Sequence, residues 1–530
     1  MQATSGRPTA SGLLEASKTR GLISTVQHSD SQDVMAYVCV LSFEVTVFSN
    51  CCTSHTICHL HQEDVLMIAD PRGLQHIFHK SAYRYTKPAD IEHASMKLFG
   101  PGVAVVNGDV HQRQRKILNP AFSAAQTKPY AQVFTVAAKS LILKWRGEVE
   151  GGAKVLDTVR FLPNMTLDAL GESIFEYEFG AMDGKKSSEL CDIIRDLFND
   201  SRGGGELKML RGALYRFAPK SVQRLLDIKK TKEDARFAHW LKTSKGIAQD
   251  LVNMKMEDGE AVEKQNDFMS VLSRAMHSTD PEKSMSPEEA LSQMATIIFA
   301  GHETSASSLN WILYELSKNP KDQEKLFHEI KTLREQTGNE GDFSPKDLEG
   351  LTYLNAVIKE SLRLHPIVPE LVRQAVSDDS IPLDYPIVDT SGSVLREIPV
   401  TKGQRITTSI HRYNRQVLSP LSPLSPLKEI WGSDADEWNP ERFVNKKTPT
   451  TLGVFGNLMT FSGGIRGCIG WRFAVLEIQV VLAALIEAFV FSVPEGIEVE
   501  DVRVGLMIPM IKGRWKEGSK MLLEVTLRQA

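Results

Sequence analysis

A cysteine in a glycine-rich turn is the part of the sequence whose chemistry is easiest to deduce. Cys468 lies in the ten residues FSGGIRGCIG that run from Phe461 to Gly470, and an apolar helical pattern begins directly after them. The free N–H groups and positive dipole at the start of a helix favour an anion, so we expect the thiol to be a thiolate. Because thiolates bind metals, Cys468 is a candidate metal ligand; the alternative is a buried structural cysteine.

The neighbours of this cysteine suit a flat, bulky ligand. Gly464 and Gly470 allow the backbone to approach a ligand closely. Phe461 could shield the sulfur from water, and Arg466 offers a guanidinium fork for a carboxylate. Iron protoporphyrin has an axial metal position, a planar face and carboxylate side chains, so it would satisfy all of these residues together.

A group of polar residues interrupts an apolar helical stretch further back. The run that ends at Ala300 is followed by Gly301, Glu303 and Thr304 before the apolar pattern resumes. Buried polar side chains in a helix are costly unless satisfied, so this cluster predicts a function. Gly301 would make room, Thr304 would hold water or dioxygen by a hydrogen bond, and Glu303 would relay protons. The alternative for Thr304 is a hydrogen bond to the carbonyl one turn earlier.

The sequence also predicts the helices and strands that must position these residues. Ser286 and Glu289 form a capping-box pattern with a proline between them, and no helix breaker follows until Asn319, so one helix of about 30 residues is expected. Apolar patterns and helix-breaking residues also predict a strand at 65–68, helices at 71–80 and 353–364, and a short helix capped at Ser344. Residues 156–240 should be mostly helical. The Ser-Pro-Leu repeat at 419–427 should be an extended surface loop, because proline at that density precludes helix and sheet interior.

The two motifs together resemble a known family. Written as Phe-x-x-Gly-x-Arg-x-Cys-x-Gly, the cysteine turn is similar to the haem-binding loop of the cytochromes P450, the haem-thiolate monooxygenases. The segment from Ala300 to Thr304 resembles the Ala/Gly-Gly-x-Glu/Asp-Thr pattern of the same family. The resemblance covers about residues 60–528. It implies a single large haem domain, mainly α with small β-sheets, that holds haem b (iron protoporphyrin IX) with Cys468 as the axial ligand.

The resemblance also implies further site residues. His111 and Arg115 share a helix face and would both reach one haem propionate, although the family commonly has tryptophan in place of this histidine. The alternative is a solvated basic helix face. Arg373, in an extended stretch, resembles the arginine that meets the second propionate.

A charge network is implied as support for the cysteine loop. Glu360 and Arg363 match the Glu-x-x-Arg pair of the family, and Arg442 completes the network. The spacing alone is weak evidence, because it recurs at other positions where it could be an ordinary solvated pair. These positions are Glu233/Arg236, Glu370/Arg373 and Glu500/Arg503.

The activity implied by the resemblance is insertion of one atom of O2 into an apolar small organic substrate. The sequence shows no flavin or nicotinamide fingerprint, so electrons would come from a separate NADPH-dependent flavoprotein reductase. By the same analogy the protein would face the cytosol at the endoplasmic reticulum membrane. The alternatives are a haem-thiolate isomerase or dehydratase and a non-catalytic haem-binding protein.

Composition excludes several other classes of protein. The chain has 530 residues, 24% of them charged, and a formal net charge of −4, so nucleic acid is not an expected partner. The six cysteines include no C-x-x-C pair, so neither a zinc site nor a secreted disulfide framework is expected. A reducing, cytosol-facing environment is the simplest interpretation.

Residues 1–60 are atypical for the family. The polar composition of residues 1 to about 35 predicts a disordered start, or an incorrect assignment of this segment to the chain. The apolar stretch from Ala36 to Phe48 is shorter than the roughly 20 residues that span a bilayer, and its odd positions alternate as in a strand. We therefore expect a strand and no clear transmembrane anchor, peripheral membrane association at most, and a haem domain over 61–530.

Overall fold

The computed structural model describes most of the chain. The described residues are 38–49, 56–184, 190, 193–194, 221, 230–257, 266–338, 341–389, 391–415, 431–432, 434–444 and 452–529. The polar start of the chain, much of the expected helical region at 156–240 and the Ser-Pro-Leu repeat at 419–427 lie outside these ranges. The architecture is mainly helical with small β-sheets, as the sequence predicted.

The largest sheet has the strand order β1-β2-β8-β5-β3. Its members are β1 (Val38–Ser49), β2 (Thr56–Ile68), β3 (Tyr85–Thr86), β5 (Glu370–Ala375) and β8 (Arg405–Ser409). β1 pairs antiparallel with β2, and β2 pairs parallel with β8. The strands expected at 36–48 and 65–68 are therefore confirmed, and the first of them is an edge strand of this sheet.

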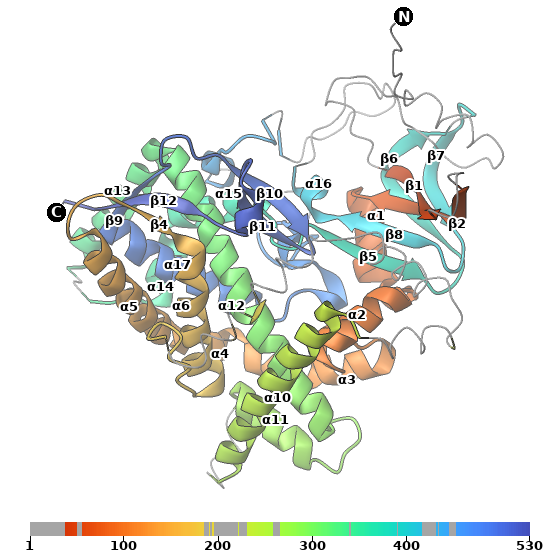
Figure 1. Cartoon of the computed structure of the whole chain (residues 1–530), viewed down its shortest axis with the longest axis horizontal. Coiled ribbons are helices and arrows are strands. Elements are labelled where there is room, and N and C mark those ends of the chain that lie inside the picture. Colours follow the sequence, from red (N-terminus) through yellow and green to blue (C-terminus); the bar gives the residue numbers. More distant parts are fainter. Residues whose placement is uncertain are drawn as a thin grey trace, which may run out of the picture.

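Three smaller sheets complete the β structure. They are β4 (Lys154–Asp157) with β12 (Leu522–Leu527) and β9 (Phe489–Ser492), β6 (Asp379–Val388) with β7 (Val394–Val400), and β10 (Val499–Val504) with β11 (Leu506–Ile511). Figure 1 shows the β1–β2 and β6–β7 strands gathered at one side of the molecule and most of the helices at the other.

Helices form the largest part of the secondary structure in the described chain. They are α1 (Pro71–Gln75), α2 (Ala89–Phe99), α3 (Gly108–Leu118), α4 (Ala124–Thr127), α5 (Ala131–Val149), α6 (Leu162–Leu170), α10 (Lys232–Glu257), α11 (Phe268–His277), α12 (Pro287–Lys318), α13 (Pro320–Thr337), α14 (Pro345–Gly350), α15 (Thr352–Leu364), α16 (Ile410–Asn414) and α17 (Trp471–Ala488). Short 3₁₀ or π turns connect several of them: His76–Lys80, Ala82–Arg84, Asn119–Phe122, Lys128–Tyr130, Thr158–Arg160, Gly171–Phe175, Pro440–Phe443, Met459–Phe461, Gly464–Arg466 and Trp515–Glu517. Within the described ranges, none of these helices combines the length and apolarity needed to cross a bilayer.

The long central helix begins and ends where the sequence predicted. The Ser286 side chain accepts the N–H of Glu289, the Glu289 side chain accepts the N–H of Ser286, and Pro287 occupies the first turn. The helix ends at Lys318, before Asn319 and the proline that opens α13. Its 32 residues span about 48 Å at 1.5 Å per residue. Figure 1 shows α12 running through the middle of the molecule.

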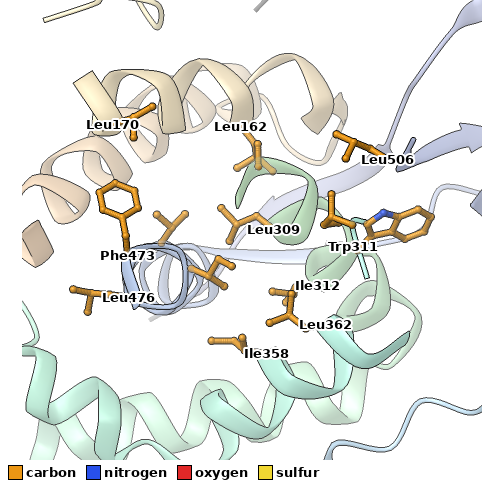
Figure 2. Close-up of a cluster of buried hydrophobic side chains, with 14 of the residues drawn as sticks. Leu162, Leu170, Leu309, Trp311, Ile312, Ile358, Leu362, Phe473, Leu476 and Leu506 are labelled. Carbon is orange, nitrogen blue, oxygen red and sulfur yellow. The ribbon is translucent and has the colours of Figure 1, made fainter. Parts of the chain in front are cut away.

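The core around α12 fixes its place. Leu309 and Ile312 of α12 are fully buried among side chains from α6, α15 and α17. Figure 2 shows this cluster, in which Leu162 and Leu170 come from α6, Ile358 and Leu362 from α15, and Phe473 and Leu476 from α17. Because interiors are close-packed, α12 cannot rotate or slide without disturbing three helices.

Candidate active site

The cysteine turn is a compact loop that leads into α17. The backbone N–H of Cys468 donates to the carbonyl of Phe461 (2.8 Å), and the N–H of Gly467 donates to the carbonyl of Gly464 (3.0 Å). Gly470 is the N-cap of α17. The half-buried ring of Phe461 lies edge-on to Phe455, with 6.1 Å between the ring centroids. The sulfur is thus held at the start of α17.

Gly464 and Gly470 differ in how strongly the surrounding protein requires a glycine at their positions. Gly464 has a φ of +63°, and a Cβ there would lie 1.9 Å from the carbonyl oxygen of Phe78. Any side chain at this position would therefore collide with the backbone. At Gly470 the nearest atom to a Cβ would be the Phe122 ring at 4.0 Å, so contacts within the described protein do not require glycine there.

The Cys468 thiol lies deep in the molecule, yet its side chain is exposed. Both observations hold if the sulfur faces an internal space. Burial raises the pKa of the thiol, while the backbone N–H of Gly470 and the charge of Arg115 lower it. The start of α17 therefore favours the thiolate, as expected, while burial of the metal-free sulfur opposes it. A metal ion bound to the sulfur would deprotonate it outright.

A second open surface lies in the middle of α12. Ala300 is exposed and Glu303 and Thr304 are half-buried, although Ile298 and Leu309 on the same helix are fully buried. An exposed alanine between buried neighbours indicates that this turn faces a space inside the molecule. The Thr304 hydroxyl donates to the carbonyl of Ala300 (2.6 Å), which is the hydrogen bond proposed as the alternative role for this residue.

Gly301 serves helix packing. A Cβ at this position would lie 2.7 Å from Cδ1 of Leu170 in α6. In the described structure Leu170 occupies the space left by the absent side chain, and the expectation that Gly301 makes room for a ligand stays a prediction. Nearby, the Thr166 hydroxyl of α6 donates to the carbonyl of His302 (3.0 Å), which fixes the same turn of α12 against α6.

Basic side chains from four segments gather near the cysteine loop. His111 of α3 is 2% exposed, and burial together with the charges of Arg466, Lys87 and Arg115 lowers its pKa to about 3. The Tyr83 hydroxyl lies 3.1 Å from its Nδ1. Neutral His111 can therefore still offer a hydrogen bond, as the sequence interpretation required, but it does not carry a charge.

The cations in this cluster lack enough counter-ions. Arg373 of β5 is 6% exposed, and burial and the charge of Arg466 lower its pKa to about 10. Lys87 precedes α2, and burial and the charges of Arg466 and Arg373 lower its pKa to about 7, although Glu92 opposes the shift. Within the described residues, Arg373 reaches no carboxylate and donates to the carbonyl of Val372. Such a group of buried and half-buried cations is costly unless an anion joins it.

Arg115 contacts the cysteine loop directly, and its expected contact with a haem propionate stays a prediction. Its Nη1 donates to the carbonyl of Gly467 (2.7 Å) and its Nε to the side chain of Asn119 (2.9 Å). It therefore connects α3 directly to the cysteine loop. Arg466 donates to the carbonyl of Val106 and to Oδ1 of Asn107 (2.9 Å).

The match to a known protein family includes the site residues described above. A family model described as cytochrome P450 matches residues 42–516, which is most of the chain. The chain belongs to the cytochrome P450 family. Members of this family hold a haem through a cysteine thiolate, so the chain is a haem-thiolate monooxygenase.

Relatives of similar length come from fungi. Cytochrome P450 monooxygenase 205 of Postia placenta is 33% identical over 482 residues, which cover 86% of this chain and 83% of the relative. Ganoderic acid synthetase CYP5150L8 of Ganoderma lucidum is 32% identical over 454 residues, covering 81% of this chain and 80% of the relative. Cytochrome P450 monooxygenase claP of Ampulloclitocybe clavipes is 30% identical over 469 residues, covering 87% and 83%.

The residues present fit the haem of the P450 family. An accessible sulfur in the interior provides a metal ligand, and the cluster of buried Arg373 with half-buried Lys87 and Arg466 has few counter-ions among the described residues, so two propionates would suit it. Lys87 gave no signal in the sequence, because it belongs to no spaced motif and meets Arg373 only through the fold.

The charge network lies in the P450 core. Nε and Nη2 of Arg363 donate to the two carboxylate oxygens of Glu360, each at 2.8 Å, and both side chains are 0% exposed. Nε of Arg442 lies 3.3 Å from Oε2 of Glu360. The backbone N–H of Asn439 also donates to Glu360 (2.8 Å). The three charged residues are thus brought together as expected.

A buried asparagine connects this network to the loop. Nη1 of Arg363 donates to the carbonyl of Asn414, and the Asn414 side chain receives the N–H of Met459 and donates to the hydroxyl of Thr460. Met459 and Thr460 immediately precede Phe461. Asn414 was not singled out from the sequence, since no motif marks it.

Proposed function

We propose that the protein inserts one atom of O2 into an apolar small organic substrate, with Cys468 as the axial ligand of haem b. The observation that carries this proposal is the interior, accessible thiol accompanied by a buried arginine and a half-buried lysine that have few counter-ions among the described residues. When bound, the haem supplies the oxidising chemistry that activates dioxygen. The chain itself holds the cofactor, excludes water and delivers protons.

The turn of α12 that carries Glu303 and Thr304 is proposed to deliver those protons. Glu303 takes up a proton from water at its carboxylate, and the Thr304 hydroxyl receives it and passes it into the internal space. For this step the Thr304 hydrogen must leave the carbonyl of Ala300, to which it now donates. The turn carries alanine and glycine beside these two residues, which suits an apolar substrate.

The basic cluster is proposed to hold the haem propionates. Arg373, Arg466 and Lys87 supply the charge, and His111 supplies a neutral hydrogen bond. Arg115 holds the cysteine loop through Gly467. Together with Glu360, Arg363 and Arg442 these residues would fix the haem on the loop side.

The electron donor and the location of the protein in the cell are proposed by analogy with the family. We propose a separate NADPH-dependent flavoprotein reductase as the electron donor, since the sequence contains no flavin or nicotinamide fingerprint. We also propose a cytosol-facing, peripheral position at the endoplasmic reticulum membrane. The single haem domain is proposed to span 61–530.

Replacing Thr304 by alanine tests the proton-delivery role. In the presence of reductase and an apolar compound that the wild type oxidises, Thr304→Ala should still consume NADPH but form product about 10²-fold more slowly, because general acid–base groups contribute on that scale. The measurement is product formed per NADPH consumed.

Thr296→Ala is the matched control for that substitution. Thr296 also donates to the carbonyl four residues earlier (2.7 Å to Ser292) in the same helix, but it is 4% exposed. If both variants couple NADPH to product equally, Thr304 acts only as a helical residue and the proposal is wrong.

Replacing Arg373 by methionine tests the propionate site without any turnover. A buried cation beside other cations destabilises the haem-free protein, so Arg373→Met should keep or raise its free energy of unfolding. The same change should weaken haem retention by about 10-fold or more, since a charge-assisted hydrogen bond is lost. The rate of haem transfer to an apoglobin measures retention, and an unchanged rate would contradict the assignment.

A further inference from the structure

Glu477 is an acid buried in the core of the helical region. It lies in α17, nine residues after Cys468, and is 0% exposed. Within the described residues neither of its carboxylate oxygens has a hydrogen bond of ordinary length and angle. An ionised carboxylate in such a place would lack all the interactions that make a buried charge tolerable.

Several charged side chains on the helices packed around α17 are engaged elsewhere. In the described part of the chain, Arg334 of α13 pairs with Glu487, and Glu360 and Arg363 of α15 pair with each other. Lys359 of α15 lies over the Phe455 ring. On α5, Lys139 pairs with Asp342, and Lys144 donates to the carbonyl of Met182. On α12, burial lowers the pKa of His302 to about 4, so it is neutral as well. None of these groups offers a positive charge to Glu477.

One hydroxyl is close to this carboxyl group. Ser305 of α12 is 1% exposed, and its hydroxyl is near enough to favour the charged form of Glu477, although the two do not form a hydrogen bond of ordinary geometry in the described structure. Burial dominates and raises the pKa of Glu477 to about 8. The carboxyl group is therefore mostly protonated at neutral pH, and a protonated carboxyl has one O–H to donate.

We propose that Glu477 is a positioning residue that stays protonated and donates its hydrogen to the hydroxyl of Ser305. Ser305 directly follows Thr304, and α17 starts just after Cys468. The hydrogen bond therefore ties the helix of the proton-delivering turn to the helix that follows the sulfur. This inference rests on the proposed function for its catalytic consequence, but the protonation of Glu477 does not depend on it.

Side chains of α6 also contact the turn of α12 that carries Thr304. Thr166 of α6 binds the carbonyl of His302, and Leu170 fills the space beside Gly301. Together with Ser305 these contacts hold the turn from two helices. Loss of the Glu477 contact would let the turn move towards or away from the internal space, which would misplace Thr304 without removing it.

The first test is the pH dependence of unfolding of the haem-loaded protein. The folded state keeps the Glu477 proton up to about pH 8, whereas the unfolded chain loses it near the ordinary value of 4.5. The unfolded state therefore binds fewer protons in this window, and stability falls as pH rises from about 4.5 to about 8. The Tm of the wild type should fall by several degrees relative to Glu477→Gln between these limits. Parallel curves for the two proteins would overturn the inference.

The second test is the coupling of NADPH to product. Glu477→Gln keeps a donor for Ser305 and should retain coupling, and at pH 9 it should couple better than the wild type. Glu477→Leu and Ser305→Ala remove one partner each and should lower product per NADPH several-fold. Ser317→Ala, another buried serine of α12, is the control, because its hydroxyl bonds only to the carbonyl of Tyr314 among the described residues.

The outcomes separate the two proposals. If Glu477→Leu couples as well as Glu477→Gln, the hydrogen bond does not position the turn and the inference is wrong. If the wild type forms no product from any apolar compound, the proposed function fails, and the unfolding curves still decide whether Glu477 holds its proton.

Discussion

Replacing Cys468 by histidine is expected to leave haem bound while abolishing monooxygenase activity. Histidine keeps a metal ligand at the same backbone position, but an imidazole is neutral and donates less electron density than a thiolate. Since a thiolate ligand is what favours O–O cleavage in this family, product formation should fall on the order of 10⁴-fold or more, the scale seen when an enzyme loses an essential group.

The absorption spectrum of the reduced, carbon monoxide-treated protein provides the decisive readout. The wild type should show the band of thiolate-ligated haem, and Cys468→His the band of globin-like ligation. Cys468→Ala serves as the companion variant, because it has no ligand and should lose most of its haem. If Cys468→His keeps the thiolate band, another cysteine binds the iron and the assignment of Cys468 is wrong.

Local signals in the sequence predicted the elements that carry the site. The two ends of α12 follow from a capping box and an Asn-Pro pair, which act over a few residues and need no tertiary contact. The same holds for α15, which ends at Leu364 before His365 and a proline. The boundaries of these two helices were therefore accessible from sequence patterns.

The Glu-x-x-Arg spacing recurs in the sequence, and whether the two residues can pair depends on whether they lie on a helix or on a strand. On α15 the spacing places Glu360 and Arg363 on one helix face, where they pair. On strand β10 the same spacing places Glu500 and Arg503 on opposite faces, and Arg503 pairs with Asp501 two residues away. A strand has a period of two, so of these two pairs only the one on α15 could form.

The features that the sequence did not predict depend on contacts between distant segments. Lys87 meets Arg373 across almost 300 positions, and Leu170 of α6 fills the space beside Gly301. Neither Lys87 nor Leu170 belongs to a spaced motif. The pKa of Cys468 is a further case, since the helix terminus was visible in the sequence and the burial that opposes it was not.

Removing the charge of Glu360 is expected to destabilise the protein strongly. Glu360→Gln leaves Arg363 buried without a counter-ion, and breaking a buried pair in this way typically costs about 3–5 kcal/mol in the free energy of unfolding. Urea unfolding followed by circular dichroism measures the loss. Glu517→Ala is the matched control, because it removes an Arg-Glu pair of the same spacing, Arg514–Glu517, from the surface, where little change is expected.

A double variant separates the stability of the network from its role in supporting the loop. Glu360→Leu with Arg363→Met replaces the pair by apolar groups, which often recovers the stability that a single change loses. It also removes the donation from Arg363 to the carbonyl of Asn414, whose side chain holds Met459 and Thr460 before the cysteine loop. Haem retention should therefore stay low even where the free energy of unfolding returns. Full recovery of both would mean that the network stabilises only itself, and that the loop is positioned by its own hydrogen bonds and by Arg115.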